Sequence, residues 1–309
     1  MTDTGTRSRV GAYARLAKLA FFDFYLSGLV AWTLVAPDDR LRPRTLAVLA
    51  LLLPAWVCIV AATVAFDDVT GYRDGSDERN YDPRQEALRD RRRKPLLVGH
   101  LSVTQAVRFG YASTASAIFF LACALAAAPR RPAAAVALMV LVLVASIQYS
   151  YGLKLSYRGA QEFILLMSPA LTVLIPALLL RDDVGSVVVV EAFLFGVWSL
   201  LISVYSNVND IAGDRAAGRR NMATIASPGA YRVFVAALTL VEATVVLAAA
   251  ATAAVSWWVP LFLAPELVVR GRQLHVGLGG GALAARRLGI TALRLGVAGL
   301  VIANLVSVA

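Results

Sequence analysis

Cysteine and histidine are scarce in this sequence. The chain has two cysteines, Cys58 and Cys123, and two histidines, His100 and His275. Both cysteines lie inside apolar runs, so they are expected to pack as small buried side chains and not as a disulfide framework or a metal site. Two histidines so far apart also leave no histidine-based zinc site. Nothing resembles a Ser/His/Asp or Cys/His constellation for nucleophilic catalysis.

Charged residues are also few, at 16% of the chain, whereas 59% are hydrophobic and the mean hydropathy is +0.68. In an ordinary soluble domain the apolar share is closer to half. We therefore expect an integral membrane protein. The net charge of +10 falls in a few clusters. As argued below, the positions of these clusters are explained by the orientation of the chain in the membrane and by phosphate binding. Nucleic acid is therefore not expected as a partner.

Nine apolar runs approach the length of about 20 residues that a helix needs to span a membrane. They cover residues 19–36, 46–66, 105–128, 132–151, 160–180, 186–207, 231–250, 252–269 and 288–308. The expected fold is an all-α membrane bundle of nine helices that forms a single domain over residues 1–309. Ser102, with Gln105 three residues on, predicts a capping box at the start of the third span.

The distribution of Lys and Arg predicts the orientation of this bundle. Twenty-two of the thirty Lys and Arg residues lie in the N-terminal tail and in the loops on the same side, and six lie in the opposite loops. By the positive-inside rule the N-terminus is expected in the cytoplasm. The same side holds the longest predicted loop, residues 67–104, and a loop is seldom this long without a functional role or disorder.

Two acidic segments lie on this cytoplasmic side, each where an apolar run ends. Asp210 and Asp214, in the segment 207–230, are four residues apart, so a continuing helix places them on one face. Asp67 and Asp74 are seven apart and share a face in the same way. The candidate metal ligands of both segments are Asp67, Asp68, Asp74, Asp77, Asp210 and Asp214.

Basic side chains accompany these acids. Mg²⁺ commonly uses one or two carboxylates plus substrate phosphate, and Arg binds phosphate oxygens through two hydrogen bonds. The pattern therefore predicts a diphosphate bridged to the protein by Mg²⁺. The candidate diphosphate-binding residues are Arg73, Arg93, Lys94, Lys154 and Arg158.

Four stretches of the sequence resemble the motifs of the UbiA superfamily of intramembrane prenyltransferases. The run Asn209-Asp210-Ile-Ala-Gly-Asp214-Arg215 resembles its second aspartate motif. The other matching stretches, in the family's order, are residues 67–77, 94–102 and 149–159. Two residues depart from the first motif: Asp67 stands where Asn is usual, and Gly71 replaces the middle aspartate. Asp74, on the face of Asp67, is a candidate to compensate.

The resemblance implies nine helices around a central cavity, with both aspartate motifs at the cytoplasmic side. It implies that the motifs bind an isoprenyl diphosphate through Mg²⁺. Asp68 and Asp77 match acidic positions of the first motif, and Asp210 and Asp214 match metal-binding positions of the second.

The expected chemistry is ionisation of an allylic diphosphate. Metal ions and basic groups stabilise the departing diphosphate, and aromatic π-faces protect the allylic cation. The candidate catalytic residues are Asp68, Asp210, Asp214, Lys154 and Tyr149, and the candidate cavity residues are Asn207, Ser150 and Tyr205.

Three activities fit such a site. The first is transfer of the isoprenyl group to a lipophilic, aromatic or other small acceptor. The second is a terpene cyclase of the same superfamily, in which the substrate's own double bond captures the cation. A secondary transporter is the third, but it requires carboxylates near the middle of the membrane, whereas these lie at helix ends.

Overall fold

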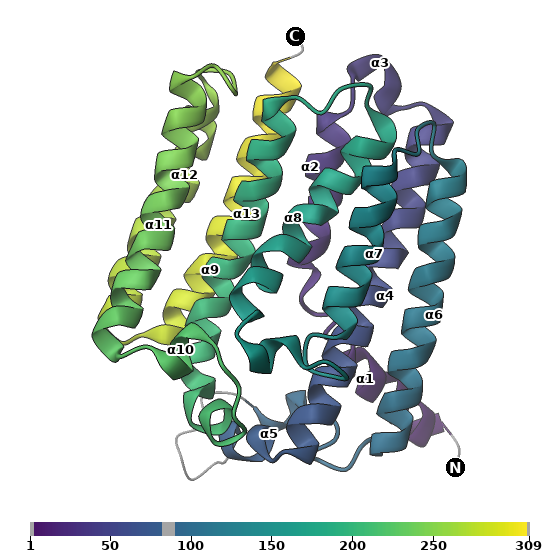
Figure 1. The fold of residues 1–309 in the computed structure, drawn as a ribbon, viewed down its shortest axis with the longest axis vertical. Helices are drawn as coiled ribbons and strands as arrows, with labels where there is room; N and C mark the ends of the chain where they lie inside the picture. Colours follow the sequence, from purple (N-terminus) through teal and green to yellow (C-terminus); the bar gives the residue numbers. More distant parts are fainter. Residues whose placement is uncertain (1–2, 82–89, 308–309) are drawn as a thin grey trace.

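The computed structural model describes residues 3–81 and 90–307, and all regular elements in this part are helices. Figure 1 shows the long helices side by side, with the short helices α1, α5 and α10 gathered at the end of the bundle that holds the N-terminus. The elements are α1 (Asp3–Leu16), η1 (Phe22–Leu26), α2 (Ser27–Leu34), α3 (Pro37–Arg40), α4 (Pro43–Arg73), α5 (Ser76–Asn80), η3 (Arg91–Arg93), α6 (Val103–Ala127), α7 (Ala133–Ile147), η4 (Leu155–Arg158), α8 (Gln161–Leu180), α9 (Ser186–Ala216), α10 (Met222–Ile225), α11 (Pro228–Ala251), α12 (Val259–Leu278) and α13 (Ala282–Val306).

Six helices of the described part are long and apolar enough to cross a membrane: α4, α6, α8, α9, α11 and α13. The best 18-residue window in each has a mean hydropathy between 1.7 and 2.5. Each coincides with a predicted span. The three remaining predicted spans coincide with η1 and α2, with the shorter apolar helix α7, and with part of α12.

The predicted helix over residues 19–36 is wrong at its start. The chain turns after α1, where Lys18 has a φ of 50° and its carbonyl accepts a hydrogen bond from the Phe21 N–H at 2.9 Å. A short 3-10 helix follows before α2 begins at Ser27. Asp23 in this 3-10 helix is buried, and its Oδ1 accepts from Arg294 Nε of α13 at 2.6 Å. This ion pair accommodates an acid that a continuous lipid-facing helix would not tolerate.

Both acidic segments are helical, so the predicted loop 67–104 begins too early. Helix α4 continues to Arg73 and helix α9 continues to Ala216. Acids at the ends of both helices have basic partners, described below. Part of the predicted loop, residues 82–89, lies outside the described residues.

The last predicted loop, residues 270–287, is also mostly helical. Helix α12 ends at Leu278 and helix α13 begins at Ala282, which leaves Gly279–Gly281 as the connection. The predicted loop residue Arg270 is buried inside α12, where its guanidinium lies 2.9 Å from both Glu242 and Glu266. Pairing explains why a charged residue can continue the helix here.

Packing brings the ends of α4 and α9 together. Helix α4 packs on α6, helix α9 packs on α8 and α13, and the short helix α5 after α4 packs on α9. The N–H of Gly213 in α9 donates to Asn80 Oδ1 of α5 at 2.9 Å. The acidic end of α4 therefore lies beside the acidic end of α9.

Candidate active site

Arg219 joins the two acidic segments. Its Nη2 donates to Asp67 Oδ1 of α4 at 2.9 Å, and its Nε lies 3.7 Å from Asp214 Oδ1 of α9. The guanidinium carbon lies 4.8 Å from the ring centre of Tyr157 and 6.0 Å from that of Tyr149. The side chain is only 9% exposed, so this cation is held between carboxylates and aromatic rings.

A glycine turn places Arg219 over its own helix. Helix α9 ends at Ala216, and Gly218 has a φ of +76°, a conformation that a residue without Cβ adopts at little cost. The Arg219 N–H then donates to the carbonyl of Asp214 at 2.8 Å, as in a Schellman motif. The chain reverses at this point, and the Arg219 side chain returns to the acids.

Lys94 lies between two acids of the first segment. Its Nζ is 2.7 Å from Asp68 Oδ1 and 2.8 Å from Asp77 Oδ1, and all three side chains are buried. Burial lowers the pKa of Lys94, but the charges of Asp68 and Asp77 outweigh it and raise this pKa well above its usual value. Burial, with the charges of Asp68 and Asp67, raises the pKa of Asp77 to about 7 despite the opposing effect of Lys94.

Asp77 occupies the space beside Gly71, the position that lacks the middle aspartate. A Cβ at Gly71 would lie 2.7 Å from Asp77 Cγ and 2.8 and 2.9 Å from its two carboxylate oxygens. Any side chain at position 71 would therefore collide with this carboxyl group. Asp74 lies elsewhere: it accepts hydrogen bonds from the Tyr157 hydroxyl and the Ser76 N–H. Asp77, and not Asp74, therefore occupies the space into which an aspartate side chain at position 71 would extend.

Three further aspartates lie close to these residues: Asp67, Asp214 and Asp210. Ser150 Oγ donates to Asp67 Oδ1 at 2.6 Å. Asn221 Nδ2 donates to Asp214 Oδ2 at 3.1 Å. Asp210 is half-buried on α9, one turn before Asp214. We call these six aspartates, together with Lys94 and Arg219, the acidic array.

The donor set of the acidic array fits Mg²⁺ in company with a phosphate. In the described residues, no group of three or more Asp, Glu, His or Cys side chains is arranged to hold a metal alone. Mg²⁺ needs only one or two carboxylates when phosphate supplies further oxygens. The buried Oδ2 atoms of Asp68 and Asp77 have no hydrogen-bond partner in this part of the chain, so each is available to a cation.

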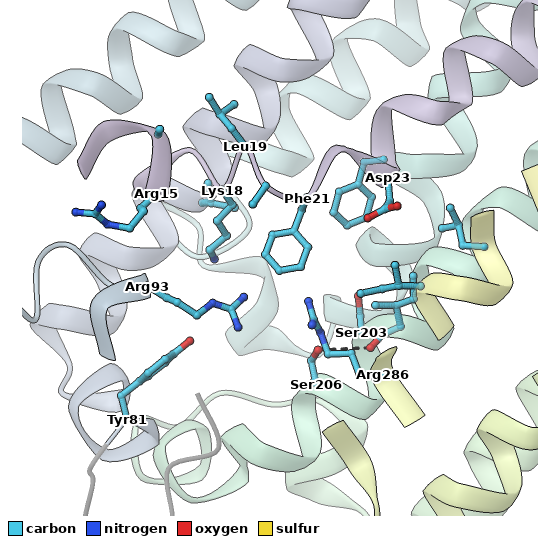
Figure 2. Close-up of a pocket in the computed structure, with 17 residues that line it drawn as sticks. Arg15, Lys18, Leu19, Phe21, Asp23, Tyr81, Arg93, Ser203, Ser206 and Arg286 are labelled. Carbon is cyan, nitrogen blue, oxygen red and sulfur yellow. Dashed lines mark hydrogen bonds between the residues drawn. The ribbon is translucent and has the colours of Figure 1, made fainter. Parts of the chain in front are cut away.

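Two adjoining cavities lie next to the array. The larger, about 450 Å³, is lined by residues of α1, η1, η3, α9 and α13, among them Lys18, Phe21 and Arg93 (Figure 2). The smaller, about 170 Å³, is lined mainly by apolar residues of α4, α7 and α8, together with Tyr149. Residues common to both linings are Phe24, Val64 and Ser203. Val64 lies on α4, one turn before the first acids.

The predicted basic residues separate into three groups. Lys94 is in the array and Arg93 lines the larger cavity. Lys154 is exposed, with its Nζ 5.0 Å from the ring centre of Tyr157. Arg73 and Arg158 are also exposed, and within the described residues the structure does not bring either into contact with the acids.

The predicted cavity residues lie in different parts of the structure. Ser150 contacts Asp67, and Asn207 is buried one turn before Asp210 with its Nδ2 unpartnered among the described residues. Tyr205 lines neither cavity. It faces a separate pocket of about 340 Å³ beside α11 and the junction of α12 and α13.

Sequence reasoning did not select Lys18, Tyr157, Arg219 or Arg286 as site residues. A signal existed for Arg219, because a glycine directly before it and after a helical acidic segment predicts a reversal of the chain. Tyr157 lies in a stretch that matched a family motif. Neither Lys18 nor Arg286 lies in a recognisable motif.

Two comparisons relate this chain to known proteins, one with protein families and one with solved structures. The model of the UbiA prenyltransferase family matches residues 24–277. No curated protein sequence matches the chain. Among solved structures, a UbiA homologue from Aeropyrum pernix K1 in its apo form has a TM-score of 0.67 at 16% identity, over 91% of this chain and 96% of that one.

Two further structures share the fold. A digeranylgeranylglyceryl phosphate synthase has a TM-score of 0.62 at 12% identity, over 96% of this chain and 98% of that one. A UbiA homologue from Archaeoglobus fulgidus bound to DMAPP and Mg²⁺ has a TM-score of 0.57 at 15% identity, over 96% and 98% of the two chains. The family match covers most of the sequence, and six helices have the length and composition of membrane spans. The chain is an integral membrane protein that belongs to the UbiA prenyltransferase family.

Proposed function

We propose that this protein is a Mg²⁺-dependent prenyltransferase that moves an isoprenyl group from an allylic diphosphate to a lipophilic, aromatic or other small acceptor. The observation that supports it most directly is the contact of Arg219 with both Asp67 of α4 and Asp214 of α9. If one diphosphate binds between two helices that carry acids, the acidic ends of these helices must lie close together. The UbiA homologue from Archaeoglobus fulgidus solved with GPP and Mg²⁺ supports the class of donor.

The candidate metal ligands are the six aspartates of the acidic array, one or two of which would hold each Mg²⁺ together with phosphate oxygens. Asp68 and Asp77 are the ligands we assign first on the α4 side, because each has an unpartnered buried oxygen, and Asp210 and Asp214 are their counterparts on α9. In this assignment Asp77 supplies the carboxylate that position 71 lacks. Bound Mg²⁺ supplies charge neutralisation at the leaving diphosphate.

The chain's own cations complete the diphosphate site. Lys94 and Arg219 lie within the array and would turn from carboxylate to phosphate oxygens when the donor binds. Arg93 lies close by at the edge of the larger cavity. Arg73, Lys154 and Arg158 are exposed, and we assign them to attracting the donor from solution.

The reaction breaks the bond between the allylic carbon and the diphosphate oxygen, and the diphosphate leaves with the electron pair. The prenyl chain lies in the smaller apolar cavity, where the π-face of Tyr149 stabilises the allylic cation. An acceptor atom then forms the new bond to the allylic carbon and loses its proton. Exclusion of water by the apolar lining prevents hydrolysis of the cation.

Topology follows from the charge distribution. We propose a single domain over residues 1–309 with nine spans, in which η1–α2, α7 and α12 complete the six long apolar helices. The excess of Lys and Arg around the acidic array then places the N-terminus and the active site on the cytoplasmic side.

A terpene cyclase is the second candidate, and the altered first motif at Gly71 favours it. The two activities separate when the purified protein is incubated with Mg²⁺ and farnesyl or geranylgeranyl diphosphate alone. A transferase leaves the donor intact until an acceptor is added. Cyclic hydrocarbon or alcohol formed without an acceptor would overturn the transferase, and a donor that stays intact under every condition would overturn both.

A further inference from the structure

The pocket of about 340 Å³ that Tyr205 faces lies apart from the two cavities beside the acidic array. It is lined by residues of α9, α11, α12 and the start of α13, at the end of the bundle that carries α10 (Figure 1). Its apolar wall includes Val208 and Ile211 of α9 and Val235 of α11. Pro228, the first residue of α11, also lines it. Because α11 is long and apolar enough to span a membrane, its first residue marks the depth of the lipid head groups. We call this pocket the α9–α11 pocket.

Two arginines line the α9–α11 pocket, and among the described residues no acid does. Arg215 lies at the end of α9 and Arg232 in the second turn of α11, and both side chains are exposed. Arg215 donates to the carbonyl of Thr224 through Nε at 3.3 Å and Nη2 at 3.1 Å, so its Nη1 is left for another acceptor. The side chain of Arg232 makes no ion pair or hydrogen bond within the described residues. The pocket therefore carries positive charge that these residues do not balance.

A buried hydroxyl in the same pocket has no partner. Tyr205 is only 4% exposed, and within the described part of the chain its hydroxyl makes no hydrogen bond. Tyr231, which also lines the pocket, differs because its hydroxyl donates to the carbonyl of Val204 at 2.6 Å. The Tyr205 ring lies against Gly277, where a Cβ would collide with it. Since a buried donor without an acceptor costs free energy, we expect a ligand oxygen to accept from Tyr205.

These three features together select one class of ligand. Exposed guanidinium groups suit phosphate oxygens, which they bind through paired hydrogen bonds. The apolar wall suits an acyl chain, and the hydroxyl of Tyr205 suits an ester oxygen between the phosphate and the chain. A free inorganic anion would use the arginines alone. Basic pockets between membrane helices, at the depth of the head groups, are typical binding sites for anionic lipids.

We infer that the α9–α11 pocket binds an anionic phospholipid from the leaflet on the side of the acidic array. The lipid phosphate binds Arg215 and Arg232, an ester oxygen accepts from Tyr205, and an acyl chain lies along the apolar wall. A zwitterionic lipid is disfavoured, because its cationic group meets two arginines and no acid in this lining. The inference is independent of the proposed reaction, since none of these three residues lines either cavity beside the array.

The test titrates lipid into the delipidated full-length protein in detergent and measures the bound lipid by native mass spectrometry. The probes are phosphatidylglycerol and phosphatidylcholine with the same two oleoyl chains, so that only the head group differs. We expect phosphatidylglycerol to bind at least about tenfold more tightly, because each basic group near an anionic lipid contributes about fivefold. Inorganic phosphate in excess should not displace it, because this ion has no chain to cover the apolar wall.

Two substitutions then locate the lipid. Arg232→Gln should weaken phosphatidylglycerol binding about fivefold and leave phosphatidylcholine binding unchanged. Arg287→Gln is the matched control, because it removes the same charge from an exposed position of α13 that does not line the pocket. Tyr205→Phe should weaken both lipids about fivefold, since both carry ester oxygens. If the hydroxyl had no lipid partner, its removal would leave the binding of both lipids unchanged.

Arg232 is a better choice for this test than Arg215. Arg215 also holds the carbonyl of Thr224 in α10, and Asn221 at the start of α10 donates to Asp214 at 3.1 Å. A substitution of Arg215 would therefore disturb the acidic array as well as the pocket. Arg232 has no such contact within the described residues, so a loss of binding in Arg232→Gln reports on the pocket alone.

Four results would overturn the inference. Binding of neither lipid, or equal affinity for both, would show that the pocket does not select an anionic lipid. Equal losses in Arg232→Gln and Arg287→Gln would indicate a general attraction to the basic surface. Displacement of phosphatidylglycerol by inorganic phosphate would assign the arginines to a free anion. Unchanged binding of both lipids in Tyr205→Phe would exclude the lipid from this pocket.

Discussion

Two buried clusters of charge in this bundle differ in their surroundings. The acidic array lies where α4, α5 and α9 end, beside the two cavities. The second cluster lies between α11 and α12, where Glu242 and Glu266 each lie 2.9 Å from Arg270 and all three are at most 1% exposed. Gln273 in the same cluster donates to the carbonyl of Leu201 in α9 at 3.0 Å. None of these four residues lines either cavity.

The difference shows that a charge inside a membrane bundle does not by itself mark a site. The second cluster connects α11 and α12 to α9 and is closed on all sides by packed helices. The acidic array is built from helix ends and loops, and its Asp68 lies 3.7 Å from Lys18, which lines the larger cavity. Substitution should therefore impair activity at the array and stability at the second cluster.

The largest effect is expected for Asp214→Ala. This change removes a proposed metal ligand from the edge of the array, so prenyl transfer should fall by at least about 100-fold, the scale of losing a key electrostatic contact. The melting temperature in detergent should stay close to that of the wild type. Asp38→Ala, at an exposed acid of α3, is the control for loss of a carboxylate. Activity near wild type in Asp214→Ala would defeat the metal assignment.

Arg270→Met should lower the stability of the protein and leave its activity largely unchanged. It leaves Glu242 and Glu266 buried without a cation, which typically costs about 3–5 kcal/mol of the free energy of unfolding. Thermal unfolding in detergent measures the loss, and activity per folded molecule at low temperature should persist. Arg272→Met, exposed on the same helix, is the control. If Arg270→Met abolished transfer without lowering stability, the two clusters would not differ as described.

Gly71→Ala should have a smaller effect on the array. The new Cβ would lie 2.7 Å from Asp77 Cγ and displace this carboxylate, so the affinity for Mg²⁺ in the presence of inorganic diphosphate should fall about tenfold, the equivalent of a contact worth about 1.4 kcal/mol. Gly28→Ala is the matched control, because a Cβ there meets nothing within 4 Å. Unchanged affinity in Gly71→Ala would mean that Asp77 is not a ligand.

Local patterns predicted much of the fold. Apolar runs of spanning length predicted the six long membrane helices, because a lipid-facing helix must be apolar over its whole length. Ser102 and Gln105 form the predicted capping box at the start of α6. Cys58 and Cys123 lie within their helices but are half-buried, whereas they were expected to be buried. The motif resemblance predicted the family, which the family match confirms.

Other features depend on partners distant in the sequence. The turn at Lys18 and the buried Asp23 depend on Arg294, which lies 271 residues further along the chain. The helical path through Arg270 depends on Glu242 of another helix. Asp77 lies beside Gly71 only because Gly75, with a φ of +75°, turns the chain back after α4. No local pattern contains these pairings.

The central claim is that acids of α4 and α9 form one site. Calorimetric titration of Mg²⁺ in the presence of inorganic diphosphate tests it, with the wild type, Asp68→Asn, Asp214→Asn and the double variant. If there is one shared site, each single substitution removes most of the binding and the double variant loses little more. Separate losses that add in the double variant, or full binding that survives in Asp68→Asn, would contradict the claim.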